Sequence, residues 1–456
     1  MPAPQPDFDA FDRLVAERSE RWAQELADFC RIPSETDQAA PLRLAAEWTA
    51  ERFRRAGAEV RFLERPDAPP LVVGEIGGGP RTLLSQDHYD VQPATPLELW
   101  TSPPFEPQIR KGRLYARGAA DDKGDFLFRL QAVEALRDAL GELPCRVRFI
   151  VEGEEESGSK HLAGYLADAP DLVEGHGALI EGGGVDEVGR PVLVCGVSGL
   201  CYVQLHVRTL AYDAHSGGAR LLPNAAWRLV QALATLRGPD DALTIDGYLD
   251  HVRQPTEAQL AHLRTLPFEE AEIKRIHGCP VFVGGRTGFA AQVAETFQPT
   301  SNIAGLVSGF TGEGEKTIVP AEAWAKMDLR LVPDLDPEIA VRCLREHLDR
   351  RGFTDVEIEP GSGESPYWTP IDDPLVDAAA AAHAGIFADE PLRFFSMPGT
   401  APLHQLCAPH GLPITSIGGS DAEVRAHAPD ESCDLDLMVK GARVMGRFLV
   451  GFAALE

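Results

Sequence analysis

Five short segments of the chain combine histidine or clustered carboxylates with small, turn-prone residues. They are residues 88–93 (HYDVQP), 116–124 (ARGAADDKG), 152–159 (EGEEESGS), 179–184 (LIEGGG) and 425–431 (RAHAPDE). Imidazole nitrogens and carboxylate oxygens are the usual protein ligands of divalent transition metals. Clustered carboxylates repel one another strongly unless cations neutralise them, so the third segment favours a metal site over a solvated acidic loop.

Several residues of these segments also have simpler interpretations. His88 could bind a metal with Asp90 orienting its ring, although an H-x-D pair also occurs in ordinary loops. Asp122 stands just ahead of an expected helix, and we interpret it as a helix N-cap. We interpret Glu152 and Glu154 as solvated carboxylates.

Strand-like apolar runs alternate with helical periodicity over the first 200 residues. Strands are expected at 71–76, 82–85, 146–151 and 178–180, and helices at 42–56 and 123–140. This alternation predicts an α/β fold with a mainly parallel sheet and helices on both faces. Because ligands bind at the carboxyl ends of parallel strands, and polar segments follow three of the expected strands, we expect the active site there.

The pattern changes after about residue 200. Residues 202–207 and 324–331 alternate as antiparallel strands do, and helices are expected at 224–236 and 337–350. This predicts an inserted α+β domain over 201–365, between two parts of a first domain at 1–200 and 366–456. The Pro- and Gly-rich residues 360–374 would be the return linker, followed by a helix at 375–387 and a strand at 413–417.

Composition excludes several classes of partner. The net charge is -27, with 70 acidic against 43 basic residues, whereas nucleic acids and anionic membranes require a cationic surface. The eight cysteines include no CxxC pair, which is typical of reduced thiols in a cytoplasmic protein. No signal peptide or membrane-length apolar run is visible. The glycine runs at 77–79 and 182–184 lack a nucleotide-binding fingerprint.

Taken in order, the five segments, together with an HSG tripeptide in the inserted domain, resemble one enzyme family. They are similar to the co-catalytic zinc peptidases that include carboxypeptidase G, carnosinase, cytosolic nonspecific dipeptidase, acetylornithine deacetylase and succinyl-diaminopimelate desuccinylase. The resemblance covers nearly the whole chain, and it implies that 1–200 and 366–456 form a catalytic domain and that 201–365 is an inserted lid and dimerisation domain. WTSPPFEP after the first segment and KTIVP before RLVP are most similar to the dipeptidase branch.

The resemblance implies two zinc ions per subunit, with manganese able to replace zinc. It assigns one ion to His88 and Glu181, the other to Glu156 and His427, and both to Asp121. Asp90 would support His88, and Glu155 would be the general base acting on a bridging water. The peptide bond after Asp121 would be cis.

In the inserted domain, His215 of the HSG tripeptide resembles a histidine that reaches the active site of the neighbouring subunit in a homodimer. There it would stabilise the oxyanion, whereas the simpler interpretation is an ordinary loop histidine. Thr317 and Arg330 resemble contacts to a substrate carboxylate, and Gly399 and Thr400 resemble a substrate-binding loop.

Three departures from the family pattern concern the substrate. Pro398 and Thr400 stand where that loop often has Gly and Ser, and Glu181 stands where carnosinase-like members have Asp. Residues 218–224 (GARLLPN) are more similar to the deacylase form than to the dipeptidase form.

The predicted function is therefore metal-dependent hydrolysis of the peptide bond of dipeptides or short peptides. The main alternative is an N-acyl-amino-acid amidohydrolase, a deacetylase or desuccinylase that uses the same dinuclear site. A catalytically silent scaffold is a third hypothesis, against which the presence of Glu155 argues.

Overall fold

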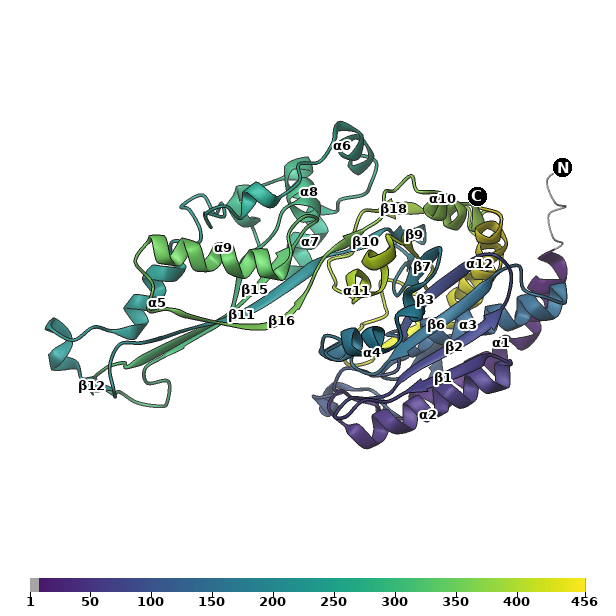
Figure 1. Cartoon of the computed structure of the whole chain (residues 1–456), viewed down its shortest axis with the longest axis horizontal. Coiled ribbons are helices and arrows are strands. Elements are labelled where there is room, and N and C mark those ends of the chain that lie inside the picture. The colour runs from purple at the N-terminus through teal and green to yellow at the C-terminus, as the bar shows by residue number, and fades with distance from the viewer. Residues whose placement is uncertain (1–7, 456) are drawn as a thin grey trace. The chain divides into compact units, whose positions relative to one another are not determined.

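The computed structural model describes residues 8–455 of the chain, which form two compact units (Figure 1). Unit 1 contains the described residues up to Gly196, Trp368–Met397, and those from Pro402 onward. Unit 2 contains Val197–Tyr367 and Pro398–Ala401. The chain therefore leaves the first unit, builds most of the second, returns, and contributes residues 398–401 to the second unit before it ends in the first.

Unit 1 is built on a six-stranded sheet of order β1-β2-β6-β3-β7-β19. Its strands are β1 (Glu59–Leu63), β2 (Leu71–Gly77), β3 (Thr82–His88), β6 (Arg146–Glu152), β7 (Gly177–Ile180) and β19 (Ile414–Ser416). β6, β3, β7 and β19 are parallel neighbours, which confirms the predicted mainly parallel sheet. β1 and β2 are antiparallel, because only residues 64–70 connect them and a parallel pair needs a long crossover.

Helices cover both faces of this sheet. α1 (Phe8–Cys30), α2 (Ala39–Ala56), α3 (Lys123–Leu140) and α12 (Leu435–Ala453) share one core with the sheet, and α10 (Pro374–Ala382) joins them. α4 (Leu162–Asp168) lies on the other side (Figure 1). β6 shows the division, because Val147 and Phe149 belong to the large core, while Arg148 donates to the carbonyls of Asp171 and Leu172.

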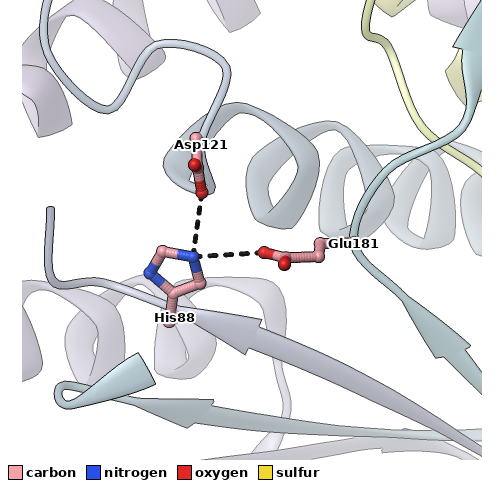
Figure 2. A group of neighbouring side chains, drawn as sticks. All are labelled: His88, Asp121 and Glu181. Carbon is pink, nitrogen blue, oxygen red and sulfur yellow. Dashed lines mark hydrogen bonds and ion pairs between the residues drawn. The ribbon is translucent and has the colours of Figure 1, made fainter. Parts of the chain in front are cut away.

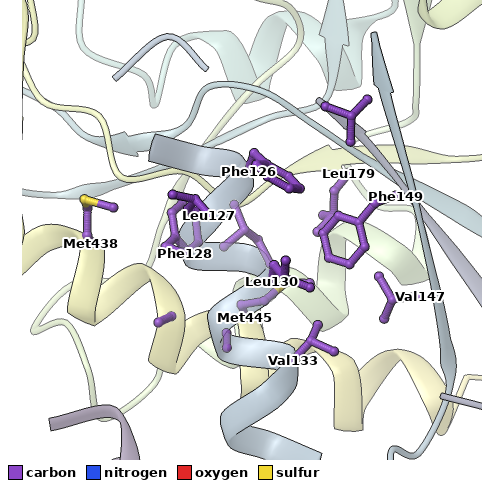
Figure 3. Close-up of a cluster of buried hydrophobic side chains, with 14 of the residues drawn as sticks. Phe126, Leu127, Phe128, Leu130, Val133, Val147, Phe149, Leu179, Met438 and Met445 are labelled. Carbon is purple, nitrogen blue, oxygen red and sulfur yellow. The ribbon is translucent and has the colours of Figure 1, made fainter. Parts of the chain in front are cut away.

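α3 is the central helix of this core and packs between the sheet and α12 (Figure 3). The Phe126 ring meets Phe53 and Phe149 edge-on, with centroids 5.5 and 6.1 Å apart, an arrangement that adds to the burial of apolar area. The helix has the predicted bounds, and Gly141 ends it in the left-handed conformation that glycine adopts readily.

Unit 2 contains an antiparallel sheet of order β13-β15-β11-β16. Its strands are β13 (Asn302–Ser308), β15 (Glu322–Leu331), β11 (Gly199–Arg208) and β16 (Glu357–Glu364). α5 (Ala225–Leu233) and α9 (Pro337–Arg350) pack on one face, and side chains of β11 alternate between buried and partly exposed. This unit has a hydrophobic core of its own.

The expected linker at 360–374 is partly wrong. Residues up to Glu364 extend β16, an edge strand that pairs with β11 through a register shift near Pro360. A proline is tolerated on an edge strand, where its missing N–H costs no ladder hydrogen bond. The helix expected at 375–387 also ends earlier, at Ala382.

The eight cysteines all lie within the described residues and are unpaired, and seven of them are buried. Within residues 8–455, no helix combines the length and apolar character needed to span a membrane.

Candidate metal centre

Three adjacent parallel strands carry proposed ligands at their carboxyl ends. His88 is the last residue of β3, Glu181 directly follows β7, and Glu156 lies in a short 3-10 helix, η2 (Glu155–Ser157), that follows β6. Because these strands are neighbours, their polar ends meet at one edge of the sheet, as the sequence pattern predicted.

The first group consists of His88, Asp121 and Glu181 (Figure 2). His88 Nε2 lies 3.1 Å from Asp121 Oδ1 and 3.3 Å from Glu181 Oε2. The other ring nitrogen, Nδ1, lies 2.9 Å from the main-chain oxygen of Asp90. A proton on Nδ1 donated to that carbonyl leaves the Nε2 lone pair directed at the carboxylates, which is the form of histidine that binds metal.

The second group consists of Asp121, Glu156 and His427. His427 Nε2 lies 2.9 Å from Asp121 Oδ2 and 3.1 Å from Glu156 Oε2. Asp121 therefore presents one carboxylate oxygen to each histidine. Gln92 Nε2 donates to Glu156 Oε2 at 2.9 Å and so holds the Glu156 carboxylate in place.

The spacing of these atoms fits ligands of a common ion. In each group, one ligand atom per residue lies within 4.8 Å of the others. Ligands bound at ~2.0–2.2 Å in tetrahedral geometry are separated from one another by ~3.3–3.6 Å. The separations of 2.9–3.3 Å are only slightly shorter. Histidine combined with carboxylates suits zinc and manganese alike.

Asp90 connects the first group to the loop of the second. Its carboxylate is fully buried, with Oδ1 3.4 Å from His88 Nδ1. The same carboxylate accepts hydrogen bonds from Glu155 N at 3.3 Å and Glu156 N at 3.1 Å. One side chain thus orients the His88 ring and fixes the start of η2.

The electrostatics of the cluster favour positive charge within it. Hydrogen bonds to Asp121 and Glu156 raise the pKa of His427 to about 10. Desolvation opposes ionisation of Asp121, but the imidazoles of His427 and His88 outweigh it and lower the Asp121 pKa. An electric field that stabilises a proton on these imidazoles also stabilises a divalent cation that replaces the proton.

Glu155 stands beside this cluster and belongs to neither group. Loss of hydration and the neighbouring charge of Glu181 raise its pKa well above the usual range. A glutamate of raised pKa can hold a proton, which a general base must do between two steps of a reaction.

The structure corrects three of the simpler interpretations. Asp122 occupies the N-cap position of α3 but makes no side-chain capping bond; instead its Oδ2 accepts from His88 N at 3.0 Å. Glu152 is only 5% exposed, because β6 extends one residue further than expected. Glu154 is paired with His161 Nδ1 at 2.9 Å. The Asp121–Asp122 peptide bond is cis, as the resemblance implied.

The protein-family model described as "Peptidase family M20/M25/M40" matches residues 84–450 of this chain. The chain belongs to this family. It is therefore a hydrolase of the metallopeptidase class.

Three relatives illustrate how far the similarity of this M20 peptidase extends. It is 26% identical over 436 residues to the Cys-Gly metallodipeptidase dug1 of Schizosaccharomyces pombe, covering 90% of each chain. It is 25% identical to the Beta-Ala-His dipeptidase of Mus musculus, covering 94% of this chain and 92% of that one. The crystal structure of the M20 family metallo-carboxypeptidase Sso-CP2 from Sulfolobus solfataricus superposes on this structure with a TM-score of 0.89 at 32% sequence identity. The superposition covers 95% of this chain and 99% of that chain.

Unit 2 of the M20 peptidase holds the other predicted residues. His215 is exposed in β12 (Ala214–His215), which pairs with β14 (Ile318–Val319). Thr317 directly precedes β14, and its carbonyl accepts from Ser216 N at 3.1 Å, so His215 and Thr317 belong to one small ribbon. His215 Nδ1 accepts from Gly217 N at 3.0 Å, which places the ring proton on Nε2.

The predicted substrate-binding loop also contacts Arg330 within unit 2. Arg330 Nη1 donates to Thr400 Oγ1 at 2.9 Å and lies 3.4 Å from the carbonyl of Pro398. The Gly399 carbonyl accepts from Ser198 N at 3.0 Å. Two residues predicted separately thus meet, while their contacts with substrate remain predictions.

Sequence reasoning gave no role to Gln92, Arg129 and Glu431, which all support ligand-bearing segments. Gln92 and Glu431 stand inside the segments at 88–93 and 425–431, in which roles were predicted only for His88, Asp90 and His427. Arg129 offered a different signal, because it is a charged residue among the buried side chains of α3.

Proposed function

We propose that this M20 peptidase hydrolyses the peptide bond of dipeptides or short peptides at a dinuclear metal centre. The observation that carries the proposal is the shared Asp121 carboxylate, with one oxygen directed at each histidine, beside Glu155, which belongs to neither ligand group. The names of the two dipeptidase relatives support a dipeptide substrate.

We propose two divalent cations, zinc in the first instance, with manganese able to replace it. One would be held by His88, Asp121 and Glu181, the other by Asp121, Glu156 and His427. Three ligand carboxylates would leave such a pair slightly cationic. When bound, the ions would polarise the scissile carbonyl and make water more acidic.

The chain's own residues would then move the proton and stabilise charge. Glu155 takes a proton from the attacking water and delivers it to the leaving amine nitrogen. Desolvation and the charge of Glu181 raise the pKa of Glu155 in the metal-free protein, and the charge of bound ions would lower it again, so that Glu155 could accept the proton and then release it. Asp90 holds His88 and Glu155 in position relative to each other through the contacts described above.

Substrate contacts are assigned to unit 2. Arg330 has the planar, doubly donating group that suits a substrate carboxylate, and Thr317, Gly399 and Thr400 would complete the contacts. His215 would donate its Nε2 proton to the oxyanion in the neighbouring subunit of a homodimer. The exposed apolar side chains Ile303, Leu306 and Val307 on β13, an edge strand, support association with a second copy.

The alternative activity is deacylation of N-acyl amino acids at the same centre. One observation favours it, the deacylase-like sequence GARLLPN at residues 218–224. The unpaired cysteines and acidic composition support a cytoplasmic location for either activity.

The test is a screen of metal-loaded protein against dipeptides and against N-acetyl and N-succinyl amino acids. We expect kcat/KM to be at least tenfold higher for the best dipeptide than for the best acyl amino acid. The reverse ranking would establish the deacylase alternative. Absence of turnover across the whole panel, with metal content verified, would support the third hypothesis, a catalytically silent scaffold.

A further inference from the structure

Two fully buried, oppositely charged side chains, Glu431 and Arg129, each connect segments that carry proposed ligands. Neither belongs to the two ligand groups. A buried charge is costly unless it is fully paired and hydrogen-bonded, so its partners show what it holds in place.

Glu431 connects the segment of His427 to the loop that ends at Asp121. Its Oε1 accepts from Ala120 N at 3.0 Å and from Asp121 N at 3.1 Å. Its Oε2 accepts from Gly118 N at 3.0 Å and from Arg117 Nη1 at 2.7 Å.

The strands on either side repeat this connection. β20 (Ser432–Asp434) begins immediately after Glu431 and pairs with β5 (Arg113–Tyr115), which immediately precedes the loop. The Glu431 carbonyl also accepts from Ala116 N at 3.1 Å. The loop of Asp121 is therefore held to the segment of His427 by both the backbone and the side chain of one glutamate.

Because Glu431 accepts from four donors, glutamine cannot take its place. A carboxylate offers acceptors on both oxygens, whereas a glutamine side chain has one oxygen and one NH2 group. In Glu431→Gln the NH2 group would face two of the four N–H donors, whichever way the amide is turned. The change keeps the size of the side chain and removes its fit to the Asp121 loop.

Arg129 makes the equivalent connection on the sheet. Its Nη1 donates to Asp87 Oδ1 at 2.9 Å, and its Nη2 donates to the Ile180 carbonyl at 2.6 Å. Asp87 directly precedes His88 on β3, and Ile180 directly precedes Glu181. One guanidinium thus fixes the two strand ends that carry the ligands of the first group.

We propose that Glu431 and Arg129 are positioning residues, and that each of them holds the ligands of one of the two metal sites in place. Glu431 sets the distance between Asp121 and His427, and Arg129 sets the distance between His88 and Glu181. The inference rests on the proposed function, because it assumes that both ligand groups bind metal.

The experiment measures Co²⁺ binding to metal-free protein by calorimetry. The position of each ion is then identified from anomalous differences in crystals soaked at limiting Co²⁺. For Glu431→Gln we expect at least tenfold weaker binding at the His427 site and a smaller change at the His88 site. For Arg129→Lys, which keeps the charge but loses the fork, we expect the opposite selectivity.

The matched controls are Glu134→Gln and Arg52→Lys. Arg52 is 4% exposed and its Nη1 donates to Glu134 at 3.2 Å, so this pair joins α2 to α3 within the same core. The controls make the same chemical changes in the Arg52–Glu134 pair, and both Co²⁺ sites should keep wild-type affinity. Urea unfolding of every metal-free variant reports any purely structural loss.

The metal-binding data distinguish a failure of this inference from a failure of the proposed function. Wild-type protein that binds fewer than two Co²⁺ ions would overturn the dinuclear function itself. Wild type with two ions, together with variants that weaken both sites equally or neither, would overturn only the division between Glu431 and Arg129.

Two further variants apply if the first pair does not fold. Arg117→Lys replaces the guanidinium that donates to Glu431 with a shorter ammonium side chain, and Asp87→Asn weakens the contact between Arg129 and β3. Each should weaken the same site as its partner variant by several-fold. Unchanged affinity at that site would overturn the proposal.

Discussion

At the scale of single residues, the centre depends on which carboxylates face a histidine and which do not. Asp121, Glu156 and Glu181 all lie within 3.3 Å of an imidazole Nε2, whereas Glu155 belongs to neither ligand group. Identical functional groups on consecutive residues therefore take different roles, because η2 directs Glu156 toward His427.

This difference predicts the behaviour of Glu155→Gln. We expect kcat to fall by roughly 10²–10⁴, the usual contribution of a general base, while both metal ions remain bound. Steady-state kinetics and metal analysis of the same preparation test this. Glu154→Gln is the matched control, because the side chain of Glu154 pairs with His161 instead, and this variant should keep kcat within a few-fold of wild type. A variant at Glu155 that loses metal, or keeps full kcat, would contradict the assignment.

A second residue-scale prediction concerns pH. Burial and the charge of Arg351 lower the pKa of His347, whose Nδ1 accepts from Asp246 N at 3.1 Å. Neutral His347 therefore contributes stability that is present above the unfolded pKa of about 6.5 and is lost as pH falls toward the lower folded value. Urea unfolding at pH 7.5 and 5.5 should show a smaller pH effect in His347→Asn than in wild type. Equal effects would show that His347 does not contribute to the pH dependence of stability.

At the scale of elements, α12 packs so closely against α1 that glycine is required at one position. A Cβ on Gly446 would overlap the ring of Phe11, which is fully buried. Alanine in a helix normally gains about 1 kcal/mol over glycine, but here overpacking should cost about 1–3 kcal/mol. Gly451→Ala on the same helix is the control, since its Cβ would lie 3.7 Å from Ala378 Cβ and should stabilise. Chemical denaturation distinguishes the two, and a stabilising Gly446→Ala would refute the close packing.

Elements were predictable where local signals agreed. α3 has the bounds that its periodicity predicted, and the polar segments lie at strand ends as parallel topology requires. The β1–β2 pair and the extension of β16 were missed, because they depend on pairing between strands and not on local composition. The buried position of Glu152 was missed for the same reason, since its exposure depends on where β6 ends.

The site was predictable only in part. Local patterns identified each segment, but the convergence of Asp121 with His427 depends on long-range contacts, and only the family resemblance anticipated it. The roles of Arg129 and Glu431 were missed because both side chains contact backbone carbonyl or N–H groups, and the sequence does not show which backbone groups a side chain will meet.

At the scale of the whole molecule, the proposed catalytic groups fall in both units. Glu155 and the metal ligands lie in unit 1, and His215 lies in unit 2. If His215 acts on the neighbouring subunit, each active site of a homodimer takes Glu155 from one chain and His215 from the other. A symmetric dimer then contains two such shared sites.

Mixed dimers of Glu155→Ala and His215→Ala test this arrangement. In a shared design, one of the two sites carries both mutations and the other carries neither, so purified mixed dimers should recover about half of wild-type activity per dimer. If His215 serves its own subunit, every site lacks one group and no activity returns. Mixed dimers of Glu155→Ala and His427→Ala are the control without rescue, because both residues lie in unit 1. Differently tagged chains, purified over both tags, ensure that only mixed dimers are assayed, and a sedimentation mass of one chain would remove the basis for sharing altogether.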